Sequence, residues 1–236
     1  MQPEGPVGRL TAIWRYPVKS LGGEALSQVD VDQRGLVGDR AWALVNAEGK
    51  LGSGKETRRF TRIPGLLMAS AKSAGEAVWV ARGGETLSAG DPELDARLSA
   101  WFDQPLTLRR EGEVPHFDDG PVSLITSSAL AQLSQWLSEE PVDPRRFRAN
   151  LLIDTDQDGF PEDAWLRRKL AFAGGLRLEV TARLTRCAMV NMETAALPAD
   201  PRLLRLVAER HEECFGVVAR VITPGRLTRG APVSLG

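Results

Sequence analysis

The sequence predicts a mostly antiparallel β protein of the α+β class, with two domains and a few helices. Short alternating or β-branched runs recur along the chain, whereas helical spacing with a clear start signal occurs in three segments. A polar, acidic stretch over 111–120, with Pro115 and Gly120, interrupts the strand pattern and marks a candidate domain boundary. The length of 236 residues allows two modest cores, which agrees with two domains.

The predicted strands are short and follow one another closely. Leu176, Leu178 and Val180 alternate with polar neighbours, which is typical of a strand that is buried on one face. The same criteria predict strands over 9–14, 26–31, 41–45, 66–71, 77–81, 106–109, 150–154, 176–183, 217–222 and 232–235.

Three helices are predicted from their caps and spacing. Asp-Pro pairs at Asp91 and Asp200 start the first and third, because aspartate caps a helix and proline fits its first turn. Ser127 or Ser128 can cap the second helix. Apolar side chains three or four residues apart should face the core, namely Leu94, Leu98 and Trp101, then Leu130, Leu133 and Leu137, then Leu203, Leu206 and Val207.

The composition argues against several classes of function. Thirty basic residues balance 31 acidic ones, so there is no positive excess for binding nucleic acid. The two cysteines and two histidines form no C-x-x-C pair, and we expect neither a zinc site nor an iron–sulfur cluster held by this chain alone. No apolar run approaches the ~20 residues of a membrane helix. Few cysteines and no signal peptide predict a reducing, cytoplasmic location.

Cys187 is the main candidate for chemistry. It follows the predicted strand over 176–183 and lies next to Arg186 and near Arg183 in sequence, a cationic setting that should favour the thiolate. A thiolate can attack electrophiles or bind soft metals. The alternative is that Cys187 is a small buried hydrophobe, the usual role of a lone intracellular cysteine.

Residues 49–55 match the phosphate-binding pattern G-x-x-x-x-G-K, but the context does not fit a nucleotide site. Glu56 stands where a hydroxyl should bind magnesium, and Pro64 soon interrupts the helix that such a loop must start. We therefore expect a flexible hairpin whose basic residues, Lys55 among them, can help to bind an anion.

Two further segments carry polar side chains suited to an anion. The sequence R-R-F-R-A-N over 145–150 either forms a guanidinium fork for phosphate or is a solvated basic loop. The sequence Y-P-V-K-S over 16–20 presents Lys19 and Ser20 together after the first strand. Asp39 and Arg40 are expected to pair in a glycine-containing turn.

Taken in order, these segments resemble the MOSC superfamily, named after the C-terminal domain of molybdenum cofactor sulfurase. The matching segments are 16–20, 34–40, 124–127, 146–150, 185–187 and 215–233. The resemblance implies a smaller N-terminal β-barrel-like domain over 1–113 and a barrel-like MOSC domain over 114–236. Ala149 departs from the family's proline, and Val190-Asn191 replaces threonines common in relatives.

The resemblance also implies a molybdenum pyranopterin cofactor (Mo-molybdopterin) between the domains; no pyridoxal phosphate is expected. Cys187 matches the catalytic cysteine whose thiolate binds the metal. The other implied cofactor-binding residues are Lys19, Ser20, Arg40, Thr126, Arg148 and Asn150, with Ser127 as a weaker neighbour.

The implied activity is reduction of N-hydroxylated or other N-oxygenated small molecules. Electrons would come from a separate ferredoxin- or flavoprotein-type donor, because the chain has no cluster motif and no dinucleotide fingerprint. Neither nucleic acid nor a membrane is an expected partner. One alternative is a non-redox sulfur carrier or cofactor-binding module with a persulfide on Cys187; another is a nucleotide hydrolase that uses residues 49–55.

Overall fold

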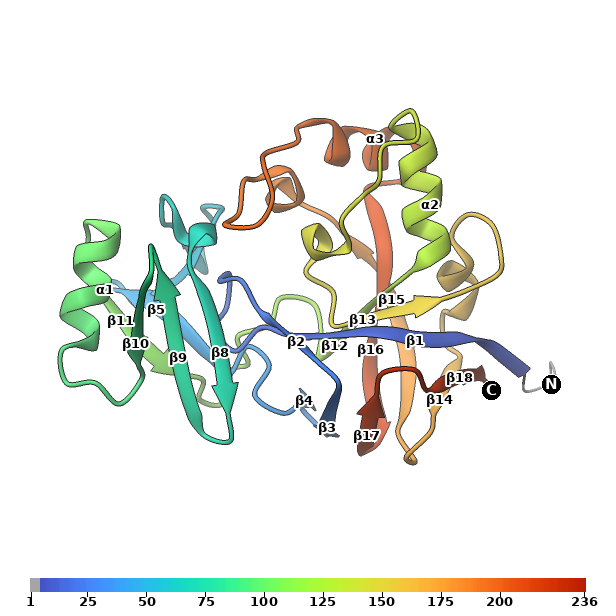
Figure 1. Cartoon of the computed structure of the whole chain (residues 1–236), viewed down its shortest axis with the longest axis horizontal. Helices are drawn as coiled ribbons and strands as arrows, with labels where there is room; N and C mark the ends of the chain where they lie inside the picture. Colours follow the sequence, from blue (N-terminus) through green and yellow to red (C-terminus); the bar gives the residue numbers. More distant parts are fainter. Residues whose placement is uncertain (1–4) are drawn as a thin grey trace.

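The largest sheet of the protein closes on itself as a barrel (Figure 1). The structure is a computed structural model that describes residues 5–236. Within these residues, seven strands follow the order β13-β12-β16-β15-β14-β18-β1, and the β1–β13 pairing closes the ring. All neighbours are antiparallel except β12 and β13. The strands are β1 (Gly5–Arg15), β12 (Val122–Thr126), β13 (Leu151–Asp154), β14 (Lys169–Phe172), β15 (Arg177–Thr185), β16 (Cys214–Thr223) and β18 (Pro232–Leu235), with β2 (Glu24–Leu26) beside β1.

Smaller sheets beside the barrel contain most of the N-terminal half (Figure 1). One sheet has the order β11-β5-β6-β7, from Leu106–Arg110, Trp42–Asn46, Leu51–Ser53 and Phe60–Arg62. The second has the order β10-β9-β8, from Glu85–Ser88, Ala77–Arg82 and Ser70–Ala74. The third joins β17 (Gly225–Thr228) to β3 (Gln28–Asp32) and β4 (Gly35–Leu36).

Three α-helices and four 3₁₀ turns in residues 5–236 complete the fold. Helix α1 (Leu94–Phe102) covers the N-terminal sheets, while α2 (Ser127–Trp136) and α3 (Arg202–His211) pack beside the barrel (Figure 1). The 3₁₀ turns are η1 (Leu66–Met68), η2 (Pro144–Phe147), η3 (Pro161–Trp165) and η4 (Ala188–Asn191). This mainly β architecture with few helices confirms the predicted fold class.

Each part of the fold has its own apolar core. Leu10, Leu124 and Val217 are fully buried inside the barrel, and Leu98 is fully buried below the N-terminal sheets. Replacement of one such leucine by alanine typically costs about 2–5 kcal/mol of stability. A third cluster, in which Phe215 is central, joins α2 and α3 to the outer face of the barrel.

The helices begin slightly later than the Asp-Pro pairs predict. Asp91 accepts a hydrogen bond from Glu93 N at 2.8 Å in the turn before α1, and Asp200 accepts one from Arg202 N at 3.1 Å before α3. The predicted cap of α2 by Ser127 or Ser128 is wrong, because Thr126 is the cap and its hydroxyl accepts from Ala129 N at 3.1 Å.

The predicted strand over 66–71 is also wrong in its first half. Gly65 adopts φ 72°, a left-handed conformation that suits glycine, and the turn η1 follows it. Strand β8 begins only at Ser70.

Strands from before and after residue 113, the expected domain boundary, pair with one another. Strand β1 completes the barrel otherwise built from residues 122–235, and β3 pairs with β17. The chain therefore passes repeatedly between the two parts of the fold before the acidic segment 111–120 returns it to the barrel.

None of the helices in the described part of the chain combines the length and apolar character required to cross a bilayer.

Candidate functional site

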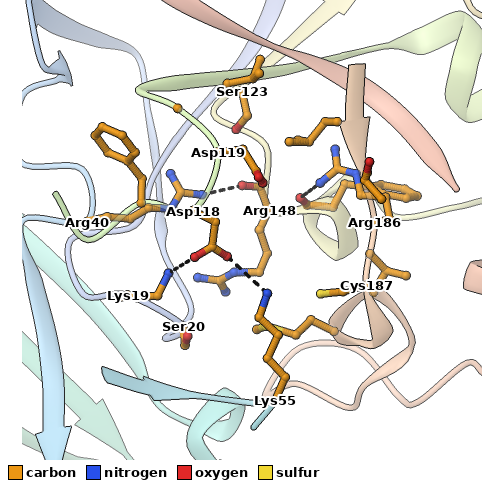
Figure 2. Close-up of a pocket in the computed structure, with 18 of the residues that line it drawn as sticks. Lys19, Ser20, Arg40, Lys55, Asp118, Asp119, Ser123, Arg148, Arg186 and Cys187 are labelled. Carbon is orange, nitrogen blue, oxygen red and sulfur yellow. Dashed lines mark hydrogen bonds and ion pairs between the residues drawn. The ribbon is translucent and has the colours of Figure 1, made fainter. Parts of the chain in front are cut away.

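Residues from both parts of the fold line one cleft with a volume of about 470 Å³ (Figure 2). Among the described residues, seven basic and two acidic side chains line it. The basic ones are Lys19, Arg40, Lys55, Arg59, Arg146, Arg148 and Arg186, and the acidic ones are Asp118 and Asp119. Low-dielectric walls strengthen the field of such a set, so the cleft attracts a compact anion.

Cys187 lies at the edge of the cleft just after β15, with its sulfur directed into the cavity (Figure 2). It is a free, half-buried thiol in extended backbone (φ −122°) immediately before η4. The carbonyls of Phe147 and Phe215 fix the guanidinium of Arg186 at 2.8 and 2.7 Å. Burial lowers the pKa of Arg186 to about 10, with Cys187 acting against the shift, so Arg186 is a cation at neutral pH.

Two lysines hold the carboxylate of Asp118 within the cleft (Figure 2). The Nζ–Oδ distances are 2.6 Å from Lys19 and 3.8 Å from Lys55, and Lys19 Nζ also lies 4.6 Å from the Phe60 ring centroid. Burial lowers the pKa of Lys19 to about 8, with Asp118 acting against the shift. Burial acts to raise the pKa of Asp118, but the charge and hydrogen bond of Lys19, together with the charges of Lys55 and Arg40, outweigh it, and the pKa lies below its ordinary value.

Arg148 and Arg40 form a linked pair on the same wall. Arg148 donates to Leu21 O at 2.7 Å, and Arg40 donates to Arg148 O at 2.8 Å while pairing with Asp39. The predicted pairing of Asp39 and Arg40 is therefore confirmed. Burial lowers the pKa of Arg148 to about 10, which still leaves it charged at neutral pH.

Three cleft residues have unusual backbone. Ser20, Arg40 and Arg148 adopt φ values of 66°, 49° and 51°, in the left-handed region that non-glycine residues seldom occupy. Such conformations cost of order 1–3 kcal/mol each and concentrate at functional sites. Three such conformations in one cleft agree with a functional site, in which the positions of the side chains are fixed at the expense of backbone strain.

The structure brings five of the predicted site residues to this cleft and leaves three outside its lining. Lys19, Ser20, Arg40, Arg148 and Cys187 line it together. The others, Thr126, Ser127 and Asn150, form hydrogen bonds within the protein.

Each of these three has a defined structural partner. The Thr126 hydroxyl donates to Glu162 Oε2 at 2.6 Å, and Ser127 Oγ accepts from Thr155 N at 3.0 Å. The amide oxygen of Asn150 accepts from Ser123 N at 3.1 Å, and Arg40 Nη1 lies 3.4 Å from the same oxygen. Asn150 therefore supports the cleft through Arg40 without lining it.

Arg183 does not contribute to the cationic setting of Cys187, contrary to the prediction. Its guanidinium pairs with Glu212 at 2.9 Å and Asp163 at 3.1 Å, and it does not line the cleft.

Asp118 and Asp119 were not predicted as site residues. They belong to the acidic segment 111–120, whose composition indicated only a boundary. Arg59 fastens this segment by donating to the carbonyl of Pro115, and Arg34 pairs with Glu111. No local pattern marks the two aspartates, because their place in the cleft depends on contacts between residues 56–99 positions apart in sequence.

The described side chains around Cys187 do not form a metal site by themselves. Among residues 5–236, no group of three or more His, Cys, Asp or Glu side chains lies close enough to hold a metal ion. A metal at Cys187 would therefore take its remaining ligands from a bound cofactor. Cys187 offers one soft thiol ligand, and the basic side chains of the same cleft offer positive charge. This combination fits a cofactor that carries both a metal with soft ligands and an anionic tail.

Two protein-family models match the chain. The MOSC N-terminal beta barrel domain matches residues 7–110, and the MOSC domain matches residues 111–234, more than half of the chain.

The relatives and the solved structure agree with these matches. The chain is 24% identical to human mitochondrial amidoxime-reducing component 1, over 97% of this chain and 83% of that protein. It is 23% identical to molybdenum cofactor sulfurase of Danio rerio, over 87% of this chain and 31% of that protein, and so spans about a third of it. The YUAD protein from Bacillus subtilis is similar in fold, with a TM-score of 0.57 at 15% identity and coverage of 100% and 98% of the two chains.

Proposed function

Because this chain belongs to the MOSC domain family and places a free cysteine in a cationic cleft, we propose that it is a molybdenum-cofactor-dependent oxidoreductase. Its substrates would be N-hydroxylated or other N-oxygenated compounds. The observation that carries the proposal is the position of Cys187, whose sulfur faces the same cavity as Lys19, Arg40 and Arg148 (Figure 2). The name of the amidoxime-reducing relative supports the substrate class.

The residues of the cleft fit the two ends of such a cofactor. Cys187 would bind the metal as a thiolate, the form in which cysteine acts as a ligand. Lys19, Arg40 and Arg148 would bind the pterin phosphate, since ammonium and guanidinium groups form strong charge-assisted bonds to phosphate oxygens. Asp118 already forms ion pairs with Lys19 and Lys55 in this cationic region, which supports the proposal that an anion binds there.

Reduction of an amidoxime to an amidine consumes two electrons and two protons and releases water. When bound, the molybdenum centre would supply the two-electron chemistry by which the N–O bond is broken. The chain would orient the cofactor and exclude competing anions. The electrons would come from a separate ferredoxin- or flavoprotein-type protein, since two cysteines cannot supply the four thiolates of a usual iron–sulfur cluster.

The decisive experiment uses protein produced in a host that makes the cofactor. We expect about one molybdenum and one pterin per chain, measured by elemental analysis and by fluorescence of the oxidised pterin, together with amidoxime reduction. Cys187→Ala should abolish the reduction while leaving the fold intact, because truncation of one half-buried thiol removes little packing. Cys214→Ala is the matched control, because Cys214 is also free and half-buried but does not line the cleft. Full activity of Cys187→Ala would refute the proposed ligand.

A second function is supported by the similarity to molybdenum cofactor sulfurase. In that case the Cys187 thiolate would take a sulfane sulfur atom from a persulfide donor, which leaves as a thiol, and the resulting Cys187 persulfide would pass this sulfur to an acceptor without redox turnover. Cyanide-labile sulfur on wild-type protein that contains no molybdenum, lost in Cys187→Ala, would favour the sulfur carrier over the reductase.

A further inference from the structure

A second, smaller chamber of about 150 Å³ adjoins the cationic cleft. Arg146, Arg148, Met189 and Val190 line both spaces, so the two cavities are neighbours with common walls. Met189 and Val190 belong to η4, which begins directly after Cys187. Cys187 therefore directly precedes the turn that forms part of the wall common to both spaces.

The walls of the chamber are mainly apolar and come from distant parts of the chain. Trp14 lies in the barrel strand β1, Leu67 lies in η1, and Met192 and Leu197 belong to the loop after η4. Ala195 N in that loop donates to Leu67 O at 3.3 Å, and Figure 1 shows the loop after η4 extending toward η1. The N-terminal sheets and the barrel side thus meet around this chamber.

Two buried hydrogen-bond donors of the chamber residues have no partner among residues 5–236. They are the Tyr16 hydroxyl and Arg146 Nη1, although Arg146 Nη2 donates to Pro198 O at 2.7 Å. Tyr16 is 3% exposed. Burial raises the pKa of its phenol, which therefore remains a protonated donor at neutral pH. Because an unsatisfied buried polar atom is unfavourable, two such donors in one lining indicate a place for a ligand acceptor.

The position of Tyr16 is tightly determined. The guanidinium carbons of Arg148 and Arg40 lie 4.5 and 4.9 Å from the centroid of its ring. A Cβ at Gly23 would come within 2.6 Å of the same ring, so only glycine permits this approach of the backbone. The phenol is therefore a preorganised part of the wall.

The size of the chamber limits what it can hold. An apolar cavity of about 150 Å³ accommodates a molecule the size of benzene. A single aromatic ring or a short branched alkyl group therefore fits, whereas a fused ring system does not.

We propose that this chamber is a specificity subsite that binds the apolar group of the N-hydroxylated substrate. The preferred group is a single ring with a hydrogen-bond acceptor such as a carboxylate, which Tyr16 and Arg146 recognise, while the N–OH end lies in the cleft near Cys187. This assignment rests on the proposed reductase function for the identity of the ligand, but the chamber can be tested without turnover.

The first test measures binding of benzoate, a ring with a carboxylate, to wild-type protein by calorimetry. We expect binding that Ala196→Phe weakens at least tenfold, because Ala196 is an exposed residue at the rim of the chamber and the new ring would block its entrance. Ala199→Phe is the matched control, since Ala199 is an exposed alanine of the same loop that does not line the chamber. Absence of benzoate binding to wild type, or equal loss in both variants, would overturn the subsite.

The second test uses the cofactor-loaded protein and three substrates: acetamidoxime, benzamidoxime and 4-carboxybenzamidoxime. Ala196→Phe should raise KM for benzamidoxime at least tenfold relative to acetamidoxime, with unchanged pterin content. Tyr16→Phe should reduce the preference for the carboxylated substrate over benzamidoxime about fivefold, because it removes only the donor. Equal changes for all three substrates, or loss of pterin in Ala196→Phe, would contradict the subsite.

The two tests separate the two proposals. If wild-type protein binds benzoate in the chamber but reduces no amidoxime, the reductase assignment fails and the chamber remains a ring-binding site. If the protein reduces amidoximes but Ala196→Phe changes KM equally for all of them, the reductase assignment holds and the subsite is refuted.

Discussion

Replacement of Glu162 by glutamine tests how the protein accommodates a buried carboxyl group next to α2. Glu162 is 0% exposed; Thr126 donates to its Oε2 at 2.6 Å, while its Oε1 has no partner in the part of the chain that the structure describes. Burial raises the pKa of Glu162 from 4.5 to about 7, against the effect of the Thr126 hydrogen bond. The folded protein therefore favours the neutral acid, and glutamine is a neutral side chain of nearly the same shape.

The sign and size of the effect follow from this shift. Between pH 4.5 and about 7 the folded state holds a proton that the unfolded state releases, so this group's contribution to stability falls as pH rises through that window. Above pH 7 the loss approaches about 3 kcal/mol, because each pKa unit corresponds to about 1.4 kcal/mol. Glu162→Gln has no carboxyl to ionise, so this loss should be absent from it.

The assay is urea unfolding of wild type and Glu162→Gln at pH 4 and pH 8. The difference in unfolding free energy, variant minus wild type, should increase by about 3 kcal/mol between the two pH values. Titration of other groups cancels in this difference, and so does any constant cost of the glutamine amide. A difference that stays constant with pH, or decreases toward pH 8, would refute a raised pKa at Glu162.

Three further changes test the cleft. Arg148→Ala should weaken cofactor retention about 10–100-fold, the value of one or two hydrogen bonds to a charged group, and unchanged pterin content after extensive dialysis would contradict this. Asp118→Asn should move the pKa of Lys19 further below about 8, because Asp118 raises that pKa, and should strengthen binding of inorganic phosphate several-fold; NMR titration of the lysine and calorimetry measure these two effects. Cys214→Ser should leave reductase activity near the wild-type value, and an inactive but stable variant would show that Cys214 is also required for the reaction.

The sequence predicts the fold well where a periodic pattern has one buried face. The alternation of Leu178 and Val180 and the helical spacing of Leu203 and Val207 correspond to buried faces of β15 and α3. Short strands such as β4, with two residues, carry too little pattern to be predicted. Their pairing depends on partners elsewhere, here on β3.

The candidate site was predictable only in part, for a related reason. Cys187 and Arg148 belong to motifs, and their presence in one cleft agrees with the order of those motifs along the chain. Thr126 shows the limit, because a hydroxyl at the start of a helix serves equally well as a cap, and the structure uses it so. Asp118 could not be found, since its contact with Lys19 joins residues 99 positions apart.

Closure of the barrel by β1 has a consequence for any attempt to divide the protein. If the chain were cut in the segment 111–120, the C-terminal piece would lose the strand that lies between β13 and β18. Both of these strands would then present free backbone N–H and C=O groups to solvent, the arrangement that promotes intermolecular strand addition. We therefore expect the isolated C-terminal piece to aggregate, and to recover as a monomer when residues 5–15 are supplied as a peptide or fused to its end.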